Sequence, residues 1–529
     1  MPRSTSHRSL LASIAAAAAL VTALVGGAPA LAQGLASHTT SPAAFVPYQF
    51  ISKSYTESLG RAPTQKEWSA QARYFQKNGC SAATLAVQLN KVLGSSEFTH
   101  LGYTPAQEAE VAYRTVLNRE PDPSGFANMV SQLSGGTSWS TVVAGAEQSP
   151  EFAALARTIC TTKNYGFGTT APISYASGPG YSGDEAGLQA LLDATAAGGT
   201  VSLARGAVIP IVQTLTIPSG VTLTTTGRPA RQAYAAMGRL SRQPGWEGES
   251  VGLTAGSTLT NVWVDGDRTR EAKFAAQRFN IILHGGDSVI SNDRIGNTAG
   301  ATNMQLDGFE HGVPYCSAVV SGNLIDAYTS QHANQLWSDG ISDGCENSTI
   351  TKNEVIDASD VGIILFATFS DTLVQKSQVT DNTVIQAGNG AFALLGVDPS
   401  TGQPAGSTRL FGGSLVADNT IWTAPTAIST FGITVGTYAW FGVGSAIGTG
   451  STVRGNTSGT LSVAAETAID VSGILNTTVV KNKIRWLQSD DPRSACPQHQ
   501  VGASVSSGYA SGTIQPYTDA LYSLCVGVG

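Results

Sequence analysis

Apolar and polar residues alternate over short stretches of the chain from about residue 200 onward. The stretch 201–227, VSLARGAVIPIVQTLTIPSGVTLTTTG, places Val, Leu, Ile and Thr between polar and turn-forming residues. Alternation with a period of two predicts β-strands, and the closely spaced Gly and Pro predict that each strand is short. We therefore expect most of the chain to consist of short strands joined by turns.

A short motif with a central asparagine recurs along this strand-rich region. Its seven copies are centred on Asn292, Asn323, Asn353, Asn382, Asn419, Asn456 and Asn482, at steps of 26 to 37 residues. Such a step fits a coil of three short strands with turns of variable length, whereas a propeller would show hairpin signals, which are missing here. Asn tolerates a left-handed turn, and stacked Asn side chains can hydrogen-bond from coil to coil. The repeat predicts a stacked β-solenoid rather than a propeller or a sandwich.

The start of this region indicates which solenoid it is. Residues 184–199, DEAGLQALLDATAAGG, predict one short amphipathic helix, and short strands ending in IPSGVTL follow. This order resembles the opening of a right-handed parallel β-helix, as in pectate-lyase-like proteins, where the helix covers the open end of the core. The resemblance implies a mainly β fold, with the β-helix over 184–490 and a cap or tail over 491–529.

A smaller, helical region precedes the solenoid. Residues 45–160 contain two similar halves, in which Tyr and then LGR or LNR are followed by a Pro turn, an amphipathic stretch and a closing SSEF or SPEF. Apolar residues at spacings of three and four predict helices, and so a small all-α domain. The halves resemble a family of bacterial domains of unknown function with LGR-x-x-D-x-x-G and S-x-E-F motifs. The resemblance implies a non-catalytic accessory domain, and residues 161–183 are predicted to be a linker.

The first 32 residues have the three parts of a secretory signal peptide. Arg3 and Arg8 precede a continuous apolar run, and Ala30-Leu31-Ala32 forms a small-residue cleavage pattern. The alternative is a membrane anchor, for which the run is short. We expect a bacterial protein that is secreted, starts near Gln33 and has no membrane span after cleavage.

Composition and charge narrow the class of protein further. Charged residues make up 13% of the chain, and the formal net charge is −7 with a pI near 5.5. A disordered chain would be more charged, and a nucleic-acid-binding protein would carry a basic face. We therefore expect a folded protein that does not bind nucleic acid.

Six cysteines in an exported chain favour disulfides over metal sites, since none forms a C-x-x-C pair. Cys316 and Cys345 precede Asn323 and Asn353 by similar distances, so they should lie on neighbouring coils and pair. Proximity in the sequence suggests that Cys80 pairs with Cys160 and Cys496 with Cys525.

The same repeat register stacks acidic residues. Asp307, Asp339 and Asp360 each precede a Gly-apolar stretch, so Asp339 and Asp360 are expected about 5 Å apart and Asp307 and Asp360 about 10 Å apart. Asp343 and His311 follow at equal offsets and should be neighbours. The other interpretation is that these are ordinary turn aspartates.

Clustered carboxyl groups raise one another's pKa and suit glycosidic cleavage. The SDGI sequence at Asp339 resembles a fragment of the active-site strand of polygalacturonase-type hydrolases, although a matching coil has no adjacent Asp-Asp pair and their Gly-His-Gly and Arg-Ile-Lys motifs are absent. In a hydrolase, Asp339 and Asp360 would be acid and base or nucleophile, with Asp307 or Asp343 in support. In a lyase, the aspartates would hold Ca²⁺ and a Lys or Arg would abstract the proton; otherwise no cofactor is expected.

Two further groups of residues are candidates for binding. Trp337 and His332, in a long insertion, could contact a sugar ring or be packed and solvated loop residues. A basic patch could bind acidic sugars or be a solvated insertion: Arg228, Arg231, Arg239, Arg242, Arg268, Arg270, Lys273 and Arg278. The sequence thus predicts a secreted enzyme that cleaves a polysaccharide, with hydrolysis favoured over elimination. The alternative is a non-catalytic adhesin or carbohydrate-binding solenoid that contacts a cell-surface glycan.

Overall fold

The structure is a computed structural model that describes residues 45–271, 278–306, 316–327, 338–366, 374–398, 408–437, 439, 447–488, 503–505, 510–515 and 524–526. Residues 44–529 form one compact unit. The predicted signal peptide lies outside the described residues. Among the helices that are described, none is long and apolar enough to cross a membrane.

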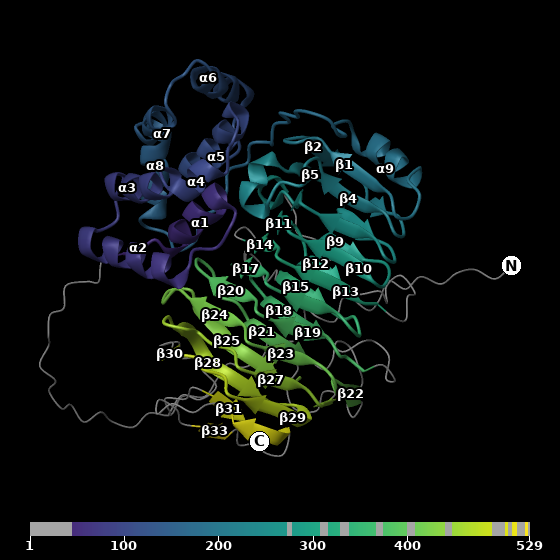
Figure 1. Ribbon diagram of the computed structural model, residues 1–529. Coiled ribbons are helices and arrows are strands. Elements are labelled where there is room, and N and C mark those ends of the chain that lie inside the picture. The colour runs from purple at the N-terminus through teal and green to yellow at the C-terminus, as the bar shows by residue number, and fades with distance from the viewer. Residues whose placement is uncertain are drawn as a thin grey trace, which may run out of the picture. The chain divides into compact units, whose positions relative to one another are not determined.

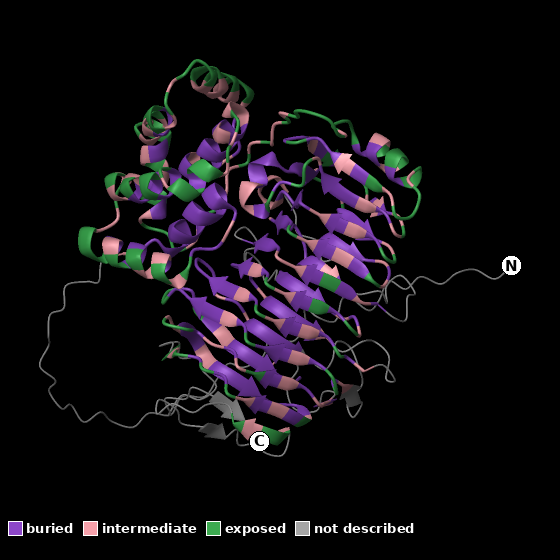
Figure 2. Ribbon diagram, in the orientation of Figure 1, coloured by how far each residue is buried: buried purple, intermediate pink, exposed green. Residues whose placement is uncertain are grey.

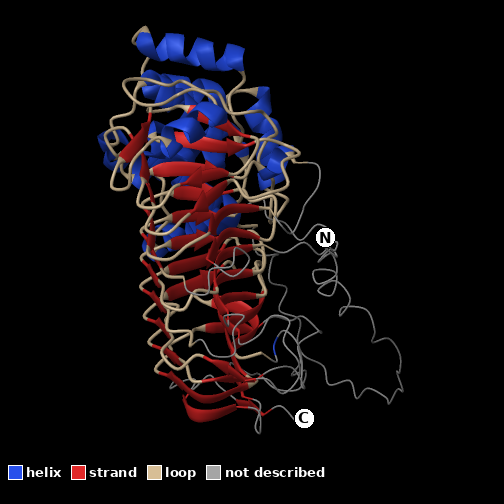
Figure 3. Ribbon diagram, turned by 90° about the vertical axis from the view of Figure 1, so that its right-hand side faces the viewer, coloured by secondary structure: helices blue, strands red, loops and turns tan. Residues whose placement is uncertain are grey.

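Three parallel sheets wind into a right-handed β-helix, as predicted (Figure 1). Neighbours within a sheet are three strands apart along the chain through most of the solenoid, because each coil contributes one strand to each sheet. Figure 3 shows the strands stacked one above another along the axis of the solenoid.

Within the described residues, the sheets have 13, 8 and 12 strands. The 13-stranded sheet contains β1 (Thr200–Leu203), β4 (Thr222–Thr225), β7 (Thr258–Thr260), β10 (Ser288–Ser291), β13 (Ala318–Ser321), β16 (Thr349–Thr351), β19 (Gln378–Thr380), β22 (Thr408–Leu410), β23 (Leu415–Ala417), β26 (Ile447–Thr449), β27 (Thr452–Arg454), β29 (Ile474–Val480) and β32 (Ala510–Gln515). The 8-stranded sheet contains β2 (Val208–Ile211), β5 (Gly238–Arg242), β8 (Val262–Asp265), β11 (Arg294–Gly296), β14 (Leu324–Asp326), β17 (Glu354–Ile356), β20 (Thr383–Gln386) and β24 (Thr420–Thr423). The 12-stranded sheet contains β3 (Leu215–Ile217), β6 (Val251–Leu253), β9 (Phe279–Leu283), β12 (Thr302–Leu306), β15 (Asp339–Asp343), β18 (Val361–Phe366), β21 (Ala393–Asp398), β25 (Ser429–Val435), β28 (Val463–Val471), β30 (Trp486–Gln488), β31 (Ala503–Val505) and β33 (Leu524–Val526).

The interior of the solenoid is a continuous apolar core. Aliphatic side chains from all three sheets fill it, and most of the strand surface in Figure 2 is buried. Helix α9 (Glu185–Asp193) covers its first coil, with Leu188 and Leu192 in the core and Glu185 accepting hydrogen bonds from the N–H groups of Val212 and Gln213. The predicted capping helix is therefore present. At the other end, β31 to β33, within residues 491–529, extend two of the sheets.

An asparagine ladder joins consecutive coils, as the repeat predicted. From Asn323 to Asn456, each side-chain Nδ2 donates to Oδ1 of the asparagine in the next coil, over 2.8–3.0 Å. The ladder residues are Asn323, Asn353, Asn382, Asn419, Asn456 and Asn482. Each of the six Nδ2 groups also donates to a backbone carbonyl of the preceding coil, so the buried amides are well paired.

The ladder corrects two details of the prediction. The first ladder position is occupied by Asp293, whose N–H donates to Asn323 Oδ1 at 2.9 Å, and not by Asn292. The left-handed residue of each turn is the one before the ladder residue, such as Asn292 (φ 57°) or Lys352 (φ 57°). The asparagines from 323 to 482 therefore recur for their amide hydrogen bonds, and the left-handed conformation falls on their neighbours.

Over residues 45–160, all of which the structure describes, eight helices form the N-terminal domain. They are α1 (Tyr48–Leu59), α2 (Gln65–Asn78), α3 (Ala82–Leu93), α4 (Ser96–His100), α5 (Pro105–Leu117), α6 (Pro123–Ser134), α7 (Trp139–Glu147) and α8 (Pro150–Ile159). Side-chain oxygens of Thr, Ser or Asp cap the N-termini of α2 to α8. The disulfide Cys80–Cys160 lies within this domain, and Cys316–Cys345 joins two coils of the β-helix, in agreement with the predicted pairs. Cys496 lies outside the described residues, so the pairing of Cys496 with Cys525 stays a prediction.

The two halves of this domain use their shared motif in the same way. Gly60 and Asn118, the middle residues of LGR and LNR, take the left-handed conformation that ends α1 and α5. The following arginines, Arg61 and Arg119, form ion pairs with the glutamates of the closing SSEF and SPEF, at 2.6 and 2.5 Å. The motif therefore stabilises each helical half.

The helical domain packs on the outer face of the 8-stranded sheet. One apolar cluster combines Ile51 and Trp68 of the helices with Leu324, Ile385 and Trp422 of the sheet. Trp68 and Trp422 meet edge to face, with ring centroids 6.3 Å apart. This covered face explains why outward-facing positions of these strands carry apolar side chains.

The segment predicted as a linker, residues 161–183, packs against both parts. Tyr165 is buried, and its N–H donates to Gln49 at 2.7 Å. Tyr175 donates from its hydroxyl to the carbonyl of Ala235, and Tyr181 packs against the β-helix core. The segment is thus part of the compact unit.

Candidate functional site

The outer face of the 12-stranded sheet is the candidate site, and a local irregularity shapes it. Two consecutive residues of several strands face the core, as Leu394 and Leu395 do in β21. A Cβ on Gly362 of β18 would likewise meet the core residue Val384. The strict alternation of sides is therefore broken, so residues three apart, such as Asp339 and Ser342, share the outer face.

Asp339 continues a row of aligned residues on the outer face. Phe279 and Thr302 precede it in register, and its carboxyl group meets the N–H of Val361, which is aligned with Ala393, Phe431 and Thr467. The Asp339 carboxyl group accepts hydrogen bonds from the Ser342 hydroxyl at 2.5 Å and from the Val361 N–H at 2.9 Å. Two groups of the protein thus fix its orientation.

Burial raises the pKa of Asp339 to about 6, because the charged carboxylate loses its hydration. The hydrogen bonds from Ser342 and Val361 act in the opposite direction, since they stabilise the ionised form. Its exposed fraction is 9%. A carboxyl group with this pKa can hold a proton in mildly acidic solution and release it near neutrality.

The other predicted carboxylates differ in where they lie. The N–H of Asp360 donates to the carbonyl of Ser338, as the N–H of Asp339 donates to that of Ala301, so the backbone of Asp360 lies beside Asp339 just before β18. The expected separation of their carboxyl groups stays a prediction. Asp343 pairs with Leu306 and Leu365, which are core residues, and is fully buried. Its Oδ1 accepts hydrogen bonds from the Cys345 N–H and the Ser348 hydroxyl. The inward position of Asp343 depends on the broken alternation, which cannot be read from the Asp-Gly pattern.

Four predicted residues lie outside the described residues: Asp307, His311, His332 and Trp337. Their places in the site remain predictions. Within the described part of the chain, no group of three or more His, Cys, Asp or Glu residues is arranged to hold a metal ion.

Three phenylalanines near Asp339 were missed by the sequence analysis. Phe366, Phe392 and Phe431 are half-buried and pack against a small cluster of Val361, Ile364 and Ala393. Phe392 and Phe431 meet edge to face, with ring centroids 5.2 Å apart. They were detectable as large apolar residues at outward positions next to the SDGI strand. The sequence-based prediction also missed His284 and Glu249, whose side chains approach to 3.3 Å.

The long connections of the solenoid begin or end at strands of this sheet. From β8 to β27, short turns join each strand of the 13-stranded sheet to the next strand of the 8-stranded sheet. The chain is long between β14 and β15, before a strand of the 12-stranded sheet, and between β12 and β13, after one. The same holds for the connections after β18, β21 and β25. Loops on a rigid scaffold are where binding groups usually occur, so this face is the best candidate.

Several arginines of the predicted basic patch bind the protein's own carboxylates. Arg231 pairs with Glu354 at 2.7 Å, and Arg278 with Glu271 at 3.3 Å. Arg239 is 4% exposed and pairs with Asp265 and, at 2.8 Å, with Glu120. At these positions the patch is neither a solvated insertion nor a free anion-binding surface.

Arg239 belongs to a buried ion network between the helical domain and the β-helix. The guanidinium groups of Arg239, Arg114 and Arg294 lie 3.9, 4.6 and 4.9 Å from the ring centre of Trp263. Arg294 donates to Glu57 of α1 at 2.6 Å and to Asp326 of β14 at 2.5 Å. Burial would raise the pKa of Glu57, but Arg114 and Arg294 outweigh it and lower that pKa to about 2.

Comparison with known proteins adds a family for part of the chain. Residues 89–156 match a family described as Domain of unknown function (DUF4214). The match covers the second helical half and the segment directly before it. No curated protein matches the chain.

Several solved structures are similar at low identity. The endo-xylogalacturonan hydrolase from Aspergillus tubingensis is 13% identical, over 66% of this chain and 98% of its own, with a TM-score of 0.37. The mannuronan C-5 epimerase A-module from Azotobacter vinelandii is 16% identical, over 64% and 86%, with a TM-score of 0.29. A tailspike protein of the E. coli bacteriophage HK620 is 12% identical, over 67% and 78%, with a TM-score of 0.30.

Proposed function

We propose that this protein is an exported enzyme that cleaves glycosidic bonds of a polysaccharide along the outer face of the 12-stranded sheet. The observation that carries the proposal is Asp339: a carboxyl group fixed by Ser342 and Val361, with a pKa raised by burial to about 6. A group of this kind can donate a proton to a leaving glycosidic oxygen.

The extended face supports a polymer as substrate. Neighbouring strands are about 4.8 Å apart, so a row over five coils spans the length of several sugar units. The half-buried rings of Phe366, Phe392 and Phe431 follow Asp339 along this face. Aromatic rings can pack against the apolar faces of sugars.

Hydrolysis is favoured over elimination because the best-defined group is a proton donor. Asp360, whose backbone lies beside Asp339 just before β18, is the candidate base or nucleophile. Asp307 is a further candidate, whereas the full burial of Asp343 favours a supporting role. In a lyase, these carboxylates would instead hold Ca²⁺ and a basic side chain would abstract a proton.

A non-catalytic carbohydrate-binding solenoid is the second candidate. It is favoured by Phe366, Phe392 and Phe431, which are partly exposed on this face, whereas Val361 and Ala393 beneath them are buried. Such rings could bind a surface glycan without cleaving it.

Export is part of the proposal. Two disulfides are typical of proteins in oxidising compartments, and the N-terminal sequence has the pattern of a signal peptide.

The test starts with turnover of plant, algal and bacterial-wall polysaccharides by the full mature chain. On any glycan that is cleaved, Asp339→Asn should lower kcat by about 10²- to 10⁴-fold. Asp381→Asn is the matched control, since Asp381 is exposed in a left-handed turn that Asn tolerates. Reducing ends without ultraviolet absorbance of unsaturated uronates would identify a hydrolase, and that absorbance would identify a lyase. No turnover on the panel, or full activity of Asp339→Asn, would favour the binding solenoid.

A further inference from the structure

Glu110 and Glu120 form a buried pair of carboxyl groups between the helical domain and the β-helix. Glu110 lies on α5 and Glu120 in the turn before α6, and each is 2% exposed. Arg239 of β5 contacts both, since it donates from Nη1 to Glu110 Oε1 at 3.5 Å and from Nη2 to Glu120 Oε1 at 2.8 Å. One guanidinium group of the solenoid thus meets two carboxyl groups of the helical domain.

The buried network around this pair contains more acids than cations. Among the described residues, its ion pairs join three arginines to five acids: Arg114, Arg239 and Arg294 with Glu57, Glu110, Glu120, Asp265 and Asp326. Lys53 adds one positive charge beside Glu57, and the excess of acids remains. If every acid were ionised, the network would carry a net negative charge away from water, which is costly.

A proton held between Glu110 and Glu120 removes part of this excess. Glu110 Oε2 and Glu120 Oε2 are buried, and neither receives a hydrogen bond from an N–H or hydroxyl donor in the described part of the chain. A carboxylate has acceptors only, so two carboxyl groups can hydrogen-bond to each other when one of them is protonated. Glu110 and Glu120 are hydrogen-bonded in this way.

The surroundings place the proton on Glu110. Burial, and then the charge of Glu120, raise the pKa of Glu110 well above its usual value. Burial would also raise the pKa of Glu120, but Arg114 and Arg239 outweigh it and lower that pKa. Glu110 is therefore the neutral acid that donates, and Glu120 is the carboxylate that accepts.

The groups that face Glu110 come from every element packed around it. They are Arg114 from α5 itself, Glu120 from the turn before α6, Arg239 from β5 and Tyr175 from the segment 161–183. Behind them, Asp265 of β8 contacts Arg239, and Tyr234 of the 3₁₀ helix η2 (Arg231–Ala236) faces Arg114. The pair is thus enclosed by both parts of the protein, and it can meet water when they separate.

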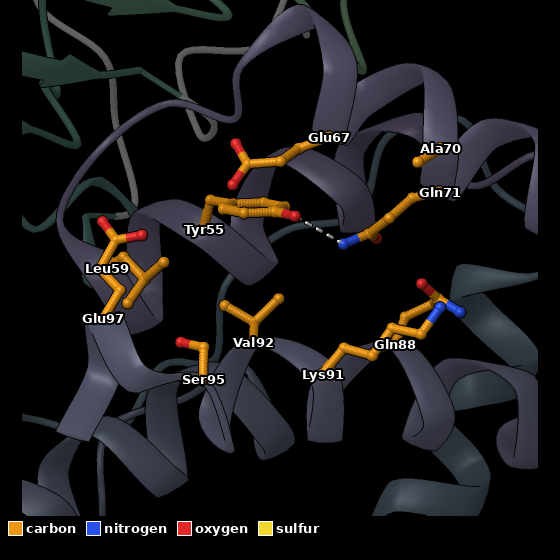
Figure 4. A pocket seen from close by; sticks show the side chains of 10 residues that line it. All are labelled: Tyr55, Leu59, Glu67, Ala70, Gln71, Gln88, Lys91, Val92, Ser95 and Glu97. Carbon is orange, nitrogen blue, oxygen red and sulfur yellow. Dashed lines mark hydrogen bonds between the residues drawn. The ribbon is translucent and has the colours of Figure 1, made fainter.

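The first half of the helical domain shows that the helices themselves do not require these charges. When the halves are aligned on the middle residues of LGR and LNR, three uncharged residues take the equivalent positions: Ser52 for Glu110, Thr56 for Arg114 and Ala62 for Glu120. Glu67 and Glu97 of the first half instead line an open pocket between α1, α2 and α3 (Figure 4), and both pair with Arg61. The buried pair is therefore specific to the half that faces Arg239.

We propose that the proton shared by Glu110 and Glu120 controls how firmly the helical domain is held on the β-helix, and that separation of α5 from β5 becomes easier as the pH rises. Glu110 keeps its proton in the docked state and loses it on opening, because its carboxyl group then ionises at its usual pKa of 4.5. By linkage, the opening constant is constant below that value and rises up to about tenfold per pH unit above it, until the raised pKa of Glu110 is reached.

Amide hydrogen exchange of α5 and β5 in the full mature chain, corrected for the intrinsic pH dependence of exchange, tests the proposal from about pH 5 to about pH 8. The opening constant of the wild type should rise with pH. In Glu110→Gln the rise should be smaller by up to about tenfold per pH unit, since the amide can donate to Glu120 but does not titrate. Glu247→Gln is the control, because the Glu247 side chain is 81% exposed, and it should keep the slope of the wild type. Asp326, whose pKa burial raises to about 6, contributes a slope that both variants retain.

Glu120→Gln separates a shared proton from a structural role of both acids. It removes the charge that Arg114 and Arg239 contact, so it should raise the opening constant at every pH by at least about tenfold. Glu110→Gln should leave the opening constant at pH 5 within about twofold of the wild type. The proposal is overturned if Glu110→Gln keeps the wild-type slope, or if it opens at pH 5 as readily as Glu120→Gln, which would mean that Glu110 acts through its charge. Should Glu120→Gln fail to fold, the slope of Glu110→Gln decides by itself.

Discussion

Asp293 takes the place of an asparagine directly beside Asn323, and its N–H donates to Asn323 Oδ1 over 2.9 Å. Its own Oδ1 accepts a hydrogen bond from the N–H of Val262, as a ladder asparagine would, whereas Oδ2 has no partner among the described residues. Burial raises the pKa of Asp293 well above its usual value, so the neutral acid is the form that suits this position.

We predict that Asp293→Asn stabilises the protein at pH 7. The folded-state pKa is higher than the unfolded one, so the native aspartate loses stability as the pH rises between the two values. Asn should therefore gain about 1–2 kcal/mol at pH 7 and almost nothing near pH 4. Urea unfolding at both pH values measures this gain. Asn353→Asp, in the middle of the ladder, should show the opposite sign, and equal stability of Asp293→Asn and wild type at pH 7 would contradict the argument.

Arg294 should be essential for docking of the helical domain. Arg294→Met removes the ion pair of the buried Asp326 and leaves Glu57 with Arg114 as its buried partner, and the expected loss is about 3–5 kcal/mol. Arg454→Met removes an exposed pair with Asp418 and should cost less than about 1 kcal/mol. Denaturant unfolding compares the two, and hydrogen exchange should show faster opening of α1 in Arg294→Met. Losses of equal size would mean that the network does not stabilise the interface.

The pH dependence of cleavage should follow Asp339. A general acid acts in its protonated form, so kcat/KM should fall as the pH rises through about 6. Ser342→Ala removes a hydrogen bond that favours the carboxylate, and the falling limb should move to higher pH. The Asp381→Asn control should keep the limb of the wild type. A limb that Ser342→Ala does not move would assign the titration to another group.

The two disulfides should contribute unequally to stability. They join residues 80 and 29 positions apart, and loop-closure entropy gives about 4.5 kcal/mol for Cys80–Cys160 and about 3.6 kcal/mol for Cys316–Cys345. Calorimetry of the Cys80→Ala/Cys160→Ala and Cys316→Ala/Cys345→Ala double variants tests this order. The reverse order would show that strain or residual structure outweighs the entropy of the unfolded chain.

The sequence predicts the solenoid well because its repeat has a local cause. Asn353 and its equivalents must place an amide at one point of every coil, and this spacing can be read without coordinates. The disulfide Cys316–Cys345 follows from the same register. The assignment of Asn292 failed by one residue because Asp293 can take the ladder position and the adjacent asparagine can take the left-handed turn.

The candidate site was harder to predict because it depends on departures from the repeat. At Gly340 and Gly362, a Cβ would meet the core side chains of Val355 and Val384, so the inward and outward sides no longer alternate. This break in the alternation turns Asp343 into the interior. The docking of the helical domain could not be predicted from the sequence either. Arg239 and Arg294 look like surface charges there, because their partners Glu120 and Glu57 come from a distant part of the chain.

The helical domain contacts the solenoid from Arg239 on β5 to Ser458 beyond β27, where Gln65 donates to the Ser458 carbonyl at 2.9 Å. Repeat proteins commonly evolve by gaining or losing whole units. Here, a duplication or deletion between these two points would shift every later contact by one unit and separate Trp68 from Trp422. The number of coils beneath the helices should therefore be constrained in evolution, and changes of length should be tolerated at the C-terminal end instead.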